Sequence, residues 1–374
     1  MKFSIAIDIL LPALQSVIGV VEKNKTLAVL ANVLVNINEG RLKLTGSDLE
    51  VEITTMIPIQ DTSICIDFTV PAKKLFEICK TLDPGMLLNF ELIDNKLILK
   101  AKRTRVTLLT LPAESFPNLD PMSSKSEFNI AQRDLQFVID ATQFSMANND
   151  VRYYLNGLLF EIFNNELRTI ATDGHRLAFS FIDTIRDSKN IEQDQPLRLL
   201  VPRKAISEIN RLLDDSEEPV KLSLSTSHLA ISFKYLTLTT KLIDGNFPNY
   251  ERVIPATELC TKNIVADKKI LNQSLTRIAV LSSEQFNSAR LQFSNNNLIA
   301  IVHNPEQEEA EEHINIDYSG DEFTIGFNVS YLVEALNAIK EDQVILSLTE
   351  NDSSCLIRGL NNEYIKYVVM PMRL

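Results

Sequence analysis

The sequence predicts an α+β fold in which one unit, two helices with antiparallel sheet, occurs three times in 374 residues. The first observation behind this prediction is a set of short alternating runs, such as 97–100, 228–233 and 344–348, whose two-residue period is typical of strands. The second is the recurrence of apolar residues at helical spacing, for example within 8–22 and 131–147. Helices combined with antiparallel strands indicate an α+β architecture.

The third observation is that the chain repeats itself. The segment 166–178, a strand-like run followed by a polar turn with an Asp-Gly pair, has counterparts at 40–50 and 297–306. Phe116 and Phe247 stand in similar local sequences, and the step between them equals the step from Pro71 to Pro202. Such spacing indicates the triplication of a domain-sized unit, larger than the repeats of a solenoid.

A strand-to-helix junction recurs as well. Val70-Pro71 resembles Val201-Pro202, and Phe327-Asn328 takes the same place after a further step of nearly equal length. Each unit is therefore predicted to carry two helices, whose apolar faces pack on sheet. The helices are expected near residues 8–22 and 72–82, 131–147 and 203–213, and 267–282 and 329–340. The predicted domains are residues 1–122, 128–253 and 254–374.

Composition describes an ordinary globular chain, with 45% hydrophobic residues and only ten glycines. Residues 2–7 are predicted to form a strand and not a signal peptide, since Asp8 and Pro12 interrupt the apolar run that follows. No run approaches the roughly 20 apolar residues that a membrane span needs. The four scattered cysteines lack a Cys-x-x-Cys pair, which favours buried reduced thiols over disulfides or zinc. We therefore expect a soluble, cytoplasmic protein.

The net charge is −12, which by itself argues against a nucleic-acid partner. Basic residues nevertheless gather on the predicted helices of all three units. Each of them alone is best explained as part of a solvated helix face, but together they would form a positive lining if the helices faced a common axis. These residues are Lys23, Lys25, Lys73, Lys74, Lys80, Arg133, Arg203, Lys204, Arg211, Lys268, Lys269 and Arg277.

Two charge clusters of opposite sign lie in the first and third units. The basic one comprises Lys96, Lys100, Lys102, Arg103 and Arg105, and the acidic one comprises Glu306, Glu308, Glu309, Glu311 and Glu312. Each alone is explained by solvation. Together they suggest that the first unit of one chain meets the third unit of another, head to tail. Such heterologous contacts close into a ring when the rotation permits, which these residues alone do not decide.

Several longer segments resemble one known family. The chain is similar along its whole length to the bacterial DNA polymerase III beta subunits, the DNA sliding clamps. The segments that carry the resemblance are 112–119, 141–147, 150–157, 171–177, 304–312 and 367–374. No single one of them is specific, but their number and order are.

The resemblance implies a head-to-tail homodimeric ring of six similar domains, with helices lining a central hole and sheets outside. Duplex DNA would pass through the hole without any base being read, so that weak attraction to phosphates is sufficient. The implied DNA-facing residues are Lys23, Lys25, Lys73, Lys74, Lys80, Asn149, Arg203, Lys204, Arg211, Lys268 and Arg277. The implied dimer interface comprises Lys96, Arg103, Arg105, Val106, Leu108, Val280, Leu281, Phe286, Glu306, Glu308 and Glu312.

The resemblance also implies a pocket for short peptide motifs of client proteins: DNA polymerases, the clamp loader and mismatch-repair proteins. Apolar side chains would form its cleft, and Arg176 and His175 would hold polar ends of an extended peptide. The implied pocket residues are Leu155, Thr172, Gly174, His175, Arg176, Leu177, Pro248, Arg252, Val253, Asn328, Tyr331, Ser354 and the tail Val368, Val369, Met370, Pro371, Met372, Arg373 and Leu374.

Two other functions fit the sequence less well than a clamp. An enzyme would use Asp173 and His175, with Asp48 or Glu50, as a metal or acid–base site. However, no third ligand, nucleophile motif or phosphate loop is evident, so we expect no catalytic residue, metal or cofactor. A scaffold that does not encircle DNA would need neither the basic lining nor the paired charge clusters. A non-catalytic processivity clamp is the better interpretation.

Overall fold

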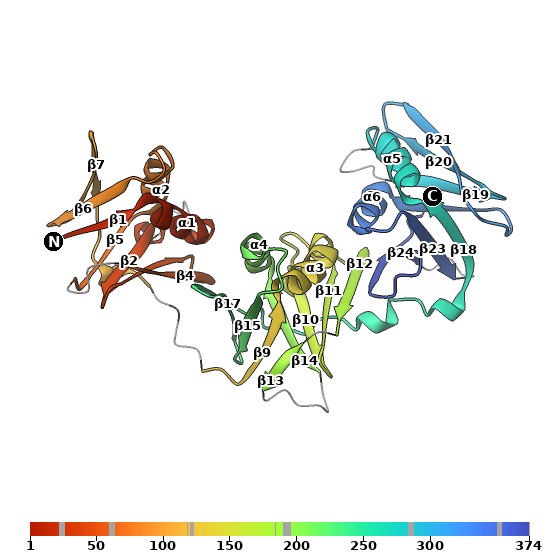
Figure 1. The fold of residues 1–374 in the computed structure, drawn as a ribbon. Helices are drawn as coiled ribbons and strands as arrows, with labels where there is room; N and C mark the ends of the chain where they lie inside the picture. Colours follow the sequence, from red (N-terminus) through yellow and green to blue (C-terminus); the bar gives the residue numbers. More distant parts are fainter. Residues whose placement is uncertain are drawn as a thin grey trace. The chain divides into compact units, whose positions relative to one another are not determined.

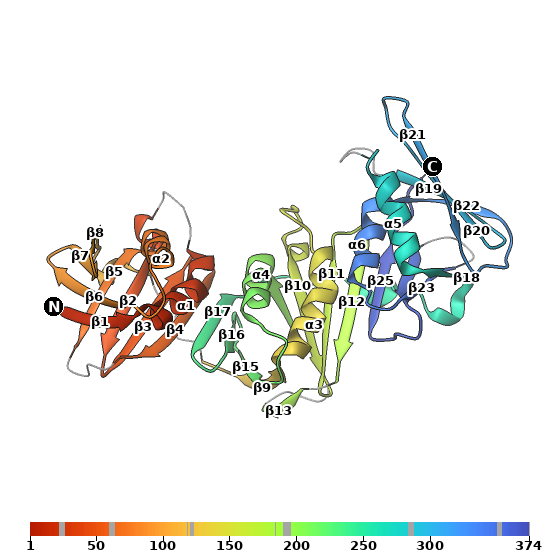
Figure 2. The same ribbon diagram turned by 45° about the horizontal axis from the view of Figure 1, so that its top comes forward.

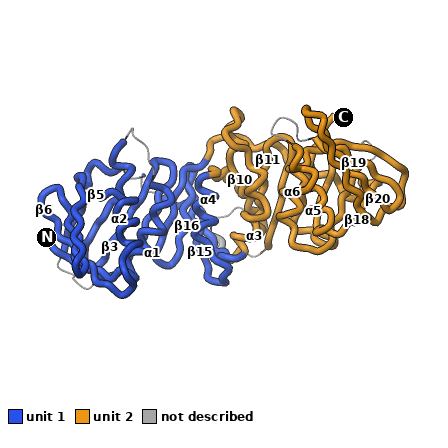
Figure 3. The backbone as a smooth tube through the Cα atoms, turned by 90° about the horizontal axis from the view of Figure 1, so that it is seen from above, with its two compact units in different colours: residues 1–133, 186–191, 204–242 blue, residues 134–185, 192–203, 243–374 orange. Residues whose placement is uncertain are grey.

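The structure is a computed structural model that describes residues 1–21, 27–59, 64–117, 119, 123–183, 185–189, 196–282, 288–349 and 354–373. By their contacts these residues form two compact units, which Figure 3 shows in two colours. Unit 1 comprises residues 1–133, 186–191 and 204–242, and unit 2 comprises residues 134–185, 192–203 and 243–374.

Unit 1 contains two antiparallel sheets. The four-stranded sheet has the order β1 (Lys2–Ala6), β6 (Leu87–Ile93), β7 (Lys96–Ala101), β8 (Thr104–Leu109). The nine-stranded sheet has the order β13 (Arg186–Lys189), β9 (Ser126–Ala131), β15 (Pro219–Leu224), β16 (His228–Ser232), β17 (Leu236–Lys241), β4 (Val51–Pro58), β3 (Arg41–Ser47), β2 (Asn32–Asn38), β5 (Ile66–Pro71). The larger sheet is continuous across two sequence repeats, because β17 of the second pairs antiparallel with β4 of the first.

Helices α1 (Ile7–Val17) and α2 (Ala72–Lys80) lie side by side in unit 1 (Figures 1 and 2). The apolar stripe of α1 buries Leu10, Leu14 and Val17 against β3 and β4, while its polar residues face outward. This burial removes the apolar face from water, and it is the main reason that so short a helix is stable here.

Unit 2 also contains two antiparallel sheets. The eight-stranded sheet has the order β14 (Leu197–Pro202), β10 (Gly157–Phe163), β11 (Glu166–Thr172), β12 (Arg176–Ile182), β25 (Ile365–Val369), β24 (Cys355–Gly359), β23 (Gln343–Thr349), β18 (Cys260–Asp267). The four-stranded sheet has the order β21 (Glu309–Asn315), β20 (Asn297–His303), β19 (Ser288–Ser294), β22 (Phe323–Asn328).

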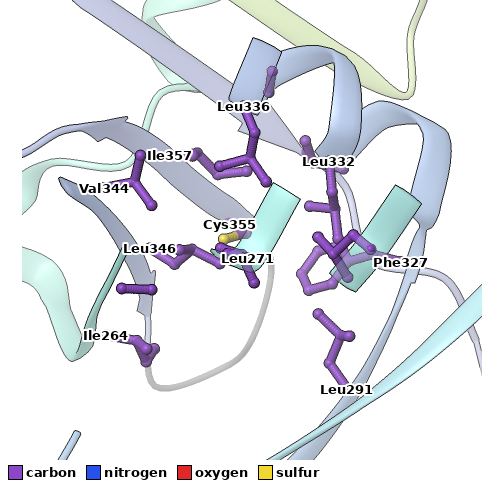
Figure 4. Packing of buried hydrophobic residues seen from close by; sticks show 14 of the residues in the cluster. Ile264, Leu271, Leu291, Phe327, Leu332, Leu336, Val344, Leu346, Cys355 and Ile357 are labelled. Atoms are coloured by element: carbon purple, nitrogen blue, oxygen red, sulfur yellow. The ribbon is translucent and has the colours of Figure 1, made fainter. Parts of the chain in front are cut away.

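Helices α5 (Lys268–Ala279) and α6 (Val329–Ala338) pack on each other and close the core of unit 2 between its two sheets. Figure 4 shows Leu271 of α5 and Leu332 of α6 in this core, with Phe327 and Leu346 from the strands around them. Their apolar contact fixes α6 against the end of β22, from which it starts.

All six predicted helices are confirmed. The other two are α3 (Gln132–Thr142) and α4 (Arg203–Leu212). The predicted helices were too long: α1 and α3 end early because Ile18–Val20 and Gln143–Ser145 form 3-10 turns, and α2, α4, α5 and α6 end one to three residues before the predicted positions. The predicted alternating strands are confirmed as well, and β5, β14 and β22 each run directly into a helix.

The prediction of buried thiols holds for three of the four cysteines. Cys79, Cys260 and Cys355 are buried, and burial raises the pKa of Cys79 to about 12. The prediction was wrong for Cys65, which is exposed in the residues that lead into β5. All four are free thiols. In the described part of the chain, no helix is both long and apolar enough to cross a membrane.

Candidate client-binding site

The turn between β11 and β12 in unit 2 is held by its own side chains. Asp173 Oδ1 accepts hydrogen bonds from the backbone N–H of His175 at 2.9 Å and of Arg176 at 3.1 Å. Thr172 Oγ1 donates to the Arg176 carbonyl at 2.6 Å. Gly174 has a φ of +91°, and a Cβ there would lie 3.0 Å from an Arg152 nitrogen, so that glycine suits both the backbone and the space.

The C-terminal strand brings the end of the chain to this turn. In the β12–β25 ladder, Leu177 lies opposite Val368. Beyond the strand, the Met370 N–H donates to the His175 carbonyl at 2.9 Å, and the Met372 N–H donates to the Gly326 carbonyl at 2.8 Å. The tail is therefore fixed by backbone hydrogen bonds on both sides of Pro371.

A cavity of about 140 Å³ opens where the turn, the tail and the segment after β17 meet. Buried Leu177 and Val368 form part of its floor, and exposed Pro248 and Met370 stand at its edge. Most of the surface is apolar with a few polar groups at the rim, which is typical of a site for a compact apolar ligand. The lining residues are Arg152, Tyr154, Leu155, Thr172, Gly174, Arg176, Leu177, Phe247, Pro248, Tyr250, Val253, Val368 and Met370.

Tyr250 is anchored below the cavity by a buried carboxylate. Its hydroxyl donates to Glu161 Oε1 at 2.7 Å, and Glu161 is only 2% exposed. Arg198 Nε also donates to this carboxylate, at 2.7 Å, and Arg168 lies 3.4 Å away. Burial, followed by the hydrogen bond to Glu161, raises the pKa of Tyr250 to about 12. The ring is thus held in place by a carboxylate that does not itself line the cavity.

Arg152 places a positive charge at the mouth of the cavity. Its guanidinium donates to Asp150 Oδ1 at 3.0 Å and to Asp150 Oδ2 at 2.9 Å, and it remains 46% exposed. These hydrogen bonds lower the pKa of Asp150 to about 2. A second cation, Arg176, is turned inward and is 10% exposed.

Arg176 is surrounded by partners within the chain. Its Nε donates to Asp173 Oδ2 at 3.0 Å, one Nη donates to Glu334 of α6 at 2.6 Å, and the other donates to the Phe144 carbonyl at 2.8 Å. The guanidinium also stacks 4.4 Å from the ring centre of Tyr331. We expected this side chain to hold a peptide, whereas the structure directs its hydrogen bonds to the protein.

The expected pocket residues fall into several groups. Those that line the cavity are Leu155, Thr172, Gly174, Arg176, Leu177, Pro248, Val253, Val368 and Met370. His175 and Tyr331 line a neighbouring polar cavity of about 590 Å³, which also includes Asn149, Arg203 and Glu334. Of the remainder, Asn328 caps the start of α6, Ser354 and Val369 are buried, and Leu374 lies outside the described residues. Like these three described residues, the expected residues Arg252, Pro371, Met372 and Arg373 line neither cavity.

Sequence reasoning missed Arg152, Tyr154, Phe247 and Tyr250 as lining residues. Arg152 and Tyr154 lie in the segment 150–157 that carries the resemblance, and Phe247 is one of the repeated phenylalanines. The repeat therefore contained a signal for Phe247. The sequence held no such signal for Tyr250, whose orientation depends on Glu161, 89 residues away.

Some residues expected to face DNA have exposed charged groups, whereas others already form hydrogen bonds or ion pairs within the chain. Lys73, Lys74 and Lys80 are exposed on α2. Others are engaged inside the chain: Arg211 with the Gln15 and Ser16 carbonyls, Lys204 with Asp48, Arg203 with the Met146 carbonyl, Lys268 with the Ile339 carbonyl and Arg277 with Glu312. Asn149 is exposed with a φ of +57°, and Lys23 and Lys25 lie outside the described residues.

The described residues expected at a dimer interface lie on the β7–β8 hairpin, on the β20–β21 hairpin and just after α5. β8 is the last strand of its sheet, and β21 is the last strand of another. Val280, which follows α5, is 78% exposed, whereas Leu108 on β8 is only 7% exposed and already packs within its own unit. Leu281 packs partly on the core of unit 2, and Glu312 is paired with Arg277 at 2.6 Å. Lys96, Arg103, Arg105, Glu306 and Glu308 are exposed, Val106 is half-buried, and Phe286 lies outside the described residues.

Comparison with known proteins gives matches along the whole chain. Sequence profiles of the DNA polymerase III beta subunit match in three parts: its N-terminal domain at residues 1–120, its central domain at 129–249 and its C-terminal domain at 251–373. The beta sliding clamp of Pseudomonas aeruginosa is 44% identical over 374 residues, with both chains fully covered. The crystal structure of that organism's DNA polymerase III subunit beta matches with a TM-score of 0.94 over both complete chains, and one of the same protein bound to griselimycin matches with a TM-score of 0.93.

Proposed function

Since the chain belongs to the DNA polymerase III beta subunit family and is a DNA sliding clamp of three domains, we propose that two copies close head to tail into a ring around duplex DNA. The ring would slide without reading bases, because only diffuse attraction to phosphates is needed when topology prevents escape. The role of the chain is to hold other proteins on DNA and not to catalyse a reaction.

The two sheet edges support the head-to-tail contact. Arg103, in the turn just before β8, and Arg105, on β8, are exposed, and the β20–β21 hairpin carries exposed Glu306 and Glu308. An open strand edge pairs readily with another strand, and opposite charges would select this pairing and orient it. Exposed Val280 would supply apolar contact, which gives such an interface most of its energy.

The exposed lysines of α2 are the best candidates for contact with DNA. Lys73, Lys74 and Lys80 lie on one short helix, and their side chains are exposed to solvent. By contrast, Arg211 and Arg277 already donate hydrogen bonds to chain carbonyls or a carboxylate. We propose that α2 attracts phosphates more strongly than the arginines of α4 and α5 do.

The cavity beside the β11–β12 turn is proposed to bind short peptide motifs of client proteins. The observation that carries this proposal is an apolar cavity with a cation at its mouth, built on two strands and a tail held by backbone hydrogen bonds. Proposed clients are DNA polymerases, the clamp loader and mismatch-repair proteins. Griselimycin, bound by the Pseudomonas aeruginosa clamp, is proposed as a ligand of this chain too.

The proposed ring is tested by whether the clamp stays on circular DNA and leaves DNA that has free ends. The clamp, loaded on nicked circular DNA by a clamp loader, should stay bound through gel filtration, and cutting the circle once should release it within minutes. A mutant with Val280→Glu should be monomeric in sedimentation and should not be retained on the circle. Retention that is unchanged after the circle is cut would show that binding is not topological.

The cavity has its own test. A fluorescein-labelled peptide that carries the clamp-binding motif of a polymerase III catalytic subunit should bind with a polarisation change that griselimycin competes away. Met370→Glu, which puts a charge at the cavity edge, should weaken binding at least ten-fold. Full affinity in that variant would place the peptide elsewhere.

We propose the cytoplasm as the compartment of the chain, because bacterial DNA is replicated there. We also propose the domain boundaries 1–122, 128–253 and 254–374, which leave one short polar link, residues 123–127, between the first and second domains.

A further inference from the structure

We infer that Arg176 is a positioning residue that couples the client cavity to helix α6, and that it does not itself hold the client's polar groups. The inference rests on the proposed client-binding function. It starts from the position of the guanidinium, which forms part of the wall between the apolar cavity and the neighbouring polar one.

The hydrogen bonds of Arg176 join three separate pieces of unit 2. Asp173 belongs to the β11–β12 turn, Phe144 belongs to the 3-10 turn after α3, and Glu334 belongs to α6. The planar fork of a guanidinium can satisfy partners in several directions at once, which an ammonium group cannot. Removing Arg176 would break all three links together.

Aromatic rings and burial hold the guanidinium in this place. Its carbon lies 4.4 Å from the ring centre of Tyr331 and 5.4 Å from that of Phe144. Only 10% of the side chain is exposed, so that charge-assisted hydrogen bonds here are stronger than at the surface. A client peptide that recruited the guanidinium would have to break one of these contacts first.

The turn that shapes the cavity depends on the same carboxylate. Asp173 receives the Arg176 side chain on Oδ2, while its Oδ1 receives the backbone N–H groups of His175 and Arg176. Neutral Gln at position 176 would leave Asp173 and Glu334 without their shared cation. The turn would then lose its link to α6, and the wall formed by Thr172 and Gly174 would loosen.

The test is a double-mutant cycle that uses the labelled polymerase peptide as its probe. Arg176→Gln should weaken probe binding by about thirty-fold. Glu334→Gln should weaken it by about three-fold to ten-fold, although Glu334 does not line the apolar cavity. The double variant should bind like Arg176→Gln alone, within about two-fold, because both changes break the same link.

Two controls separate this coupling from a general loss of structure. Glu322→Gln, which removes an exposed carboxylate just before β22, should leave binding unchanged. Arg176→Lys keeps the charge but not the fork, and should recover only part of the affinity. Amide exchange provides an independent readout: the probe should slow exchange in α6 of the native clamp and leave α6 of Arg176→Gln unchanged, because coupling between two sites is reciprocal.

The outcomes that would overturn the inference are distinct. Normal affinity in Glu334→Gln would show that α6 is not coupled to the cavity. Effects of the two variants that add fully would show that Arg176 contacts the peptide directly. If Arg176→Gln fails to fold, the same cycle with Arg176→Lys keeps the test intact. Failure of the native clamp to bind the probe would instead refute the proposed client site.

Discussion

Two strand-to-strand turns in this chain have the same pattern of side-chain to backbone hydrogen bonds, but the neighbouring site is packed in unit 1 and open in unit 2. In unit 1 the turn at Asp48 leads into β4, which pairs with β17, and in unit 2 the turn at Asp173 leads into β12, which pairs with β25. Asp48 Oδ1 accepts the N–H groups of Glu50 and Val51, in the same way that Asp173 accepts those of the residues two and three places on.

The difference lies in the aromatic residues beside each turn. Phe116 is 3% exposed and packs with Val29 and Leu34, whereas Phe247, its counterpart in the second repeat, lines the open cavity together with Tyr154. Val29 and Tyr154 hold equivalent positions, because each lies three places before the residue that pairs with the proline of its strand-to-helix junction. In the first repeat, the smaller Val29 leaves room for Phe116 to fill the site. In the second repeat, the ring of Tyr154 takes that position and the site beside Phe247 remains an open cavity. The repeated unit therefore gives both sites the same backbone, and side-chain size determines which of them leaves a cavity.

The largest difference between the two sites is expected when each phenylalanine is replaced by alanine in a separate variant. Phe116→Ala should lower the free energy of unfolding by about 3–5 kcal/mol, because it empties a fully packed site. Phe247→Ala should cost less stability, since part of the ring faces the cavity, but it should weaken binding of the labelled peptide about ten-fold. Urea unfolding and fluorescence polarisation measure the two effects. Equal loss of stability in both variants would contradict the difference in packing.

The residue after each aspartate gives the second prediction. Leu49 has a φ of +79° and Gly174 a φ of +91°, so that one copy carries a strained leucine where the other carries glycine. Gly174→Leu should cost about 1–2 kcal/mol of stability and reduce peptide binding at least ten-fold, because its Cβ meets Arg152.

The reverse change serves as the matched control. Leu49→Gly should relieve backbone strain and leave peptide binding unchanged, since this turn belongs to the other junction. Thermal unfolding of both variants would measure the strain. A loss of stability in Leu49→Gly larger than in Gly174→Leu would show that Leu49 contributes packing that outweighs its strained backbone.

The repeat explains why much of the fold could be predicted. Strand-to-helix junctions at Pro71, Pro202 and Asn328 depend on local sequence, so comparison of the chain with itself was enough to locate the helices that follow them. The hydrogen-bond partners of side chains could not be predicted in this way. Arg211 was expected to face DNA, but it donates to the Ser16 carbonyl, 195 residues away, and no local pattern reports such a contact.

The candidate site was predictable to the extent that it is built from local turns. Thr172, Gly174 and Leu177 lie in one segment with a clear turn signal, and all three line the cavity. Arg176 was expected in the site from the resemblance and was given a role for its charge, yet its guanidinium donates a hydrogen bond to Glu334 of α6, 158 residues later. The sequence thus pointed to residues that line the cavity, but not to the distant partner of Arg176 within the chain.

The third prediction concerns the polar anchor of Tyr250, which takes the place that Leu119 holds in the first repeat. Tyr250→Phe should destabilise the clamp by about 1–2 kcal/mol, because buried Glu161 loses one donor and keeps its arginines. The raised pKa of the native hydroxyl makes its contribution fully present below about pH 10 and lost as the pH rises toward about 12. The stabilities of native and variant clamp should therefore converge in that range. A constant difference across it would show that the hydroxyl does not carry the effect.

The smallest effect is expected at the mouth of the cavity, where Arg152 and Asp150 form an exposed ion pair. Because the pKa of Asp150 is lowered to about 2 in the folded clamp, the pair stabilises the protein above the ordinary Asp pKa of about 4, and this contribution is lost as the pH falls toward 2. Asp150→Asn should thus be slightly less stable than the native clamp near neutral pH and equal to it at the acid end of this range, as thermal unfolding would measure. It should weaken peptide binding less than three-fold, since Arg152 keeps its contact with the Asp173 carbonyl. A ten-fold loss of peptide affinity would show that the ion pair, and not the two aromatic rings, distinguishes the open site in unit 2 from the packed site in unit 1.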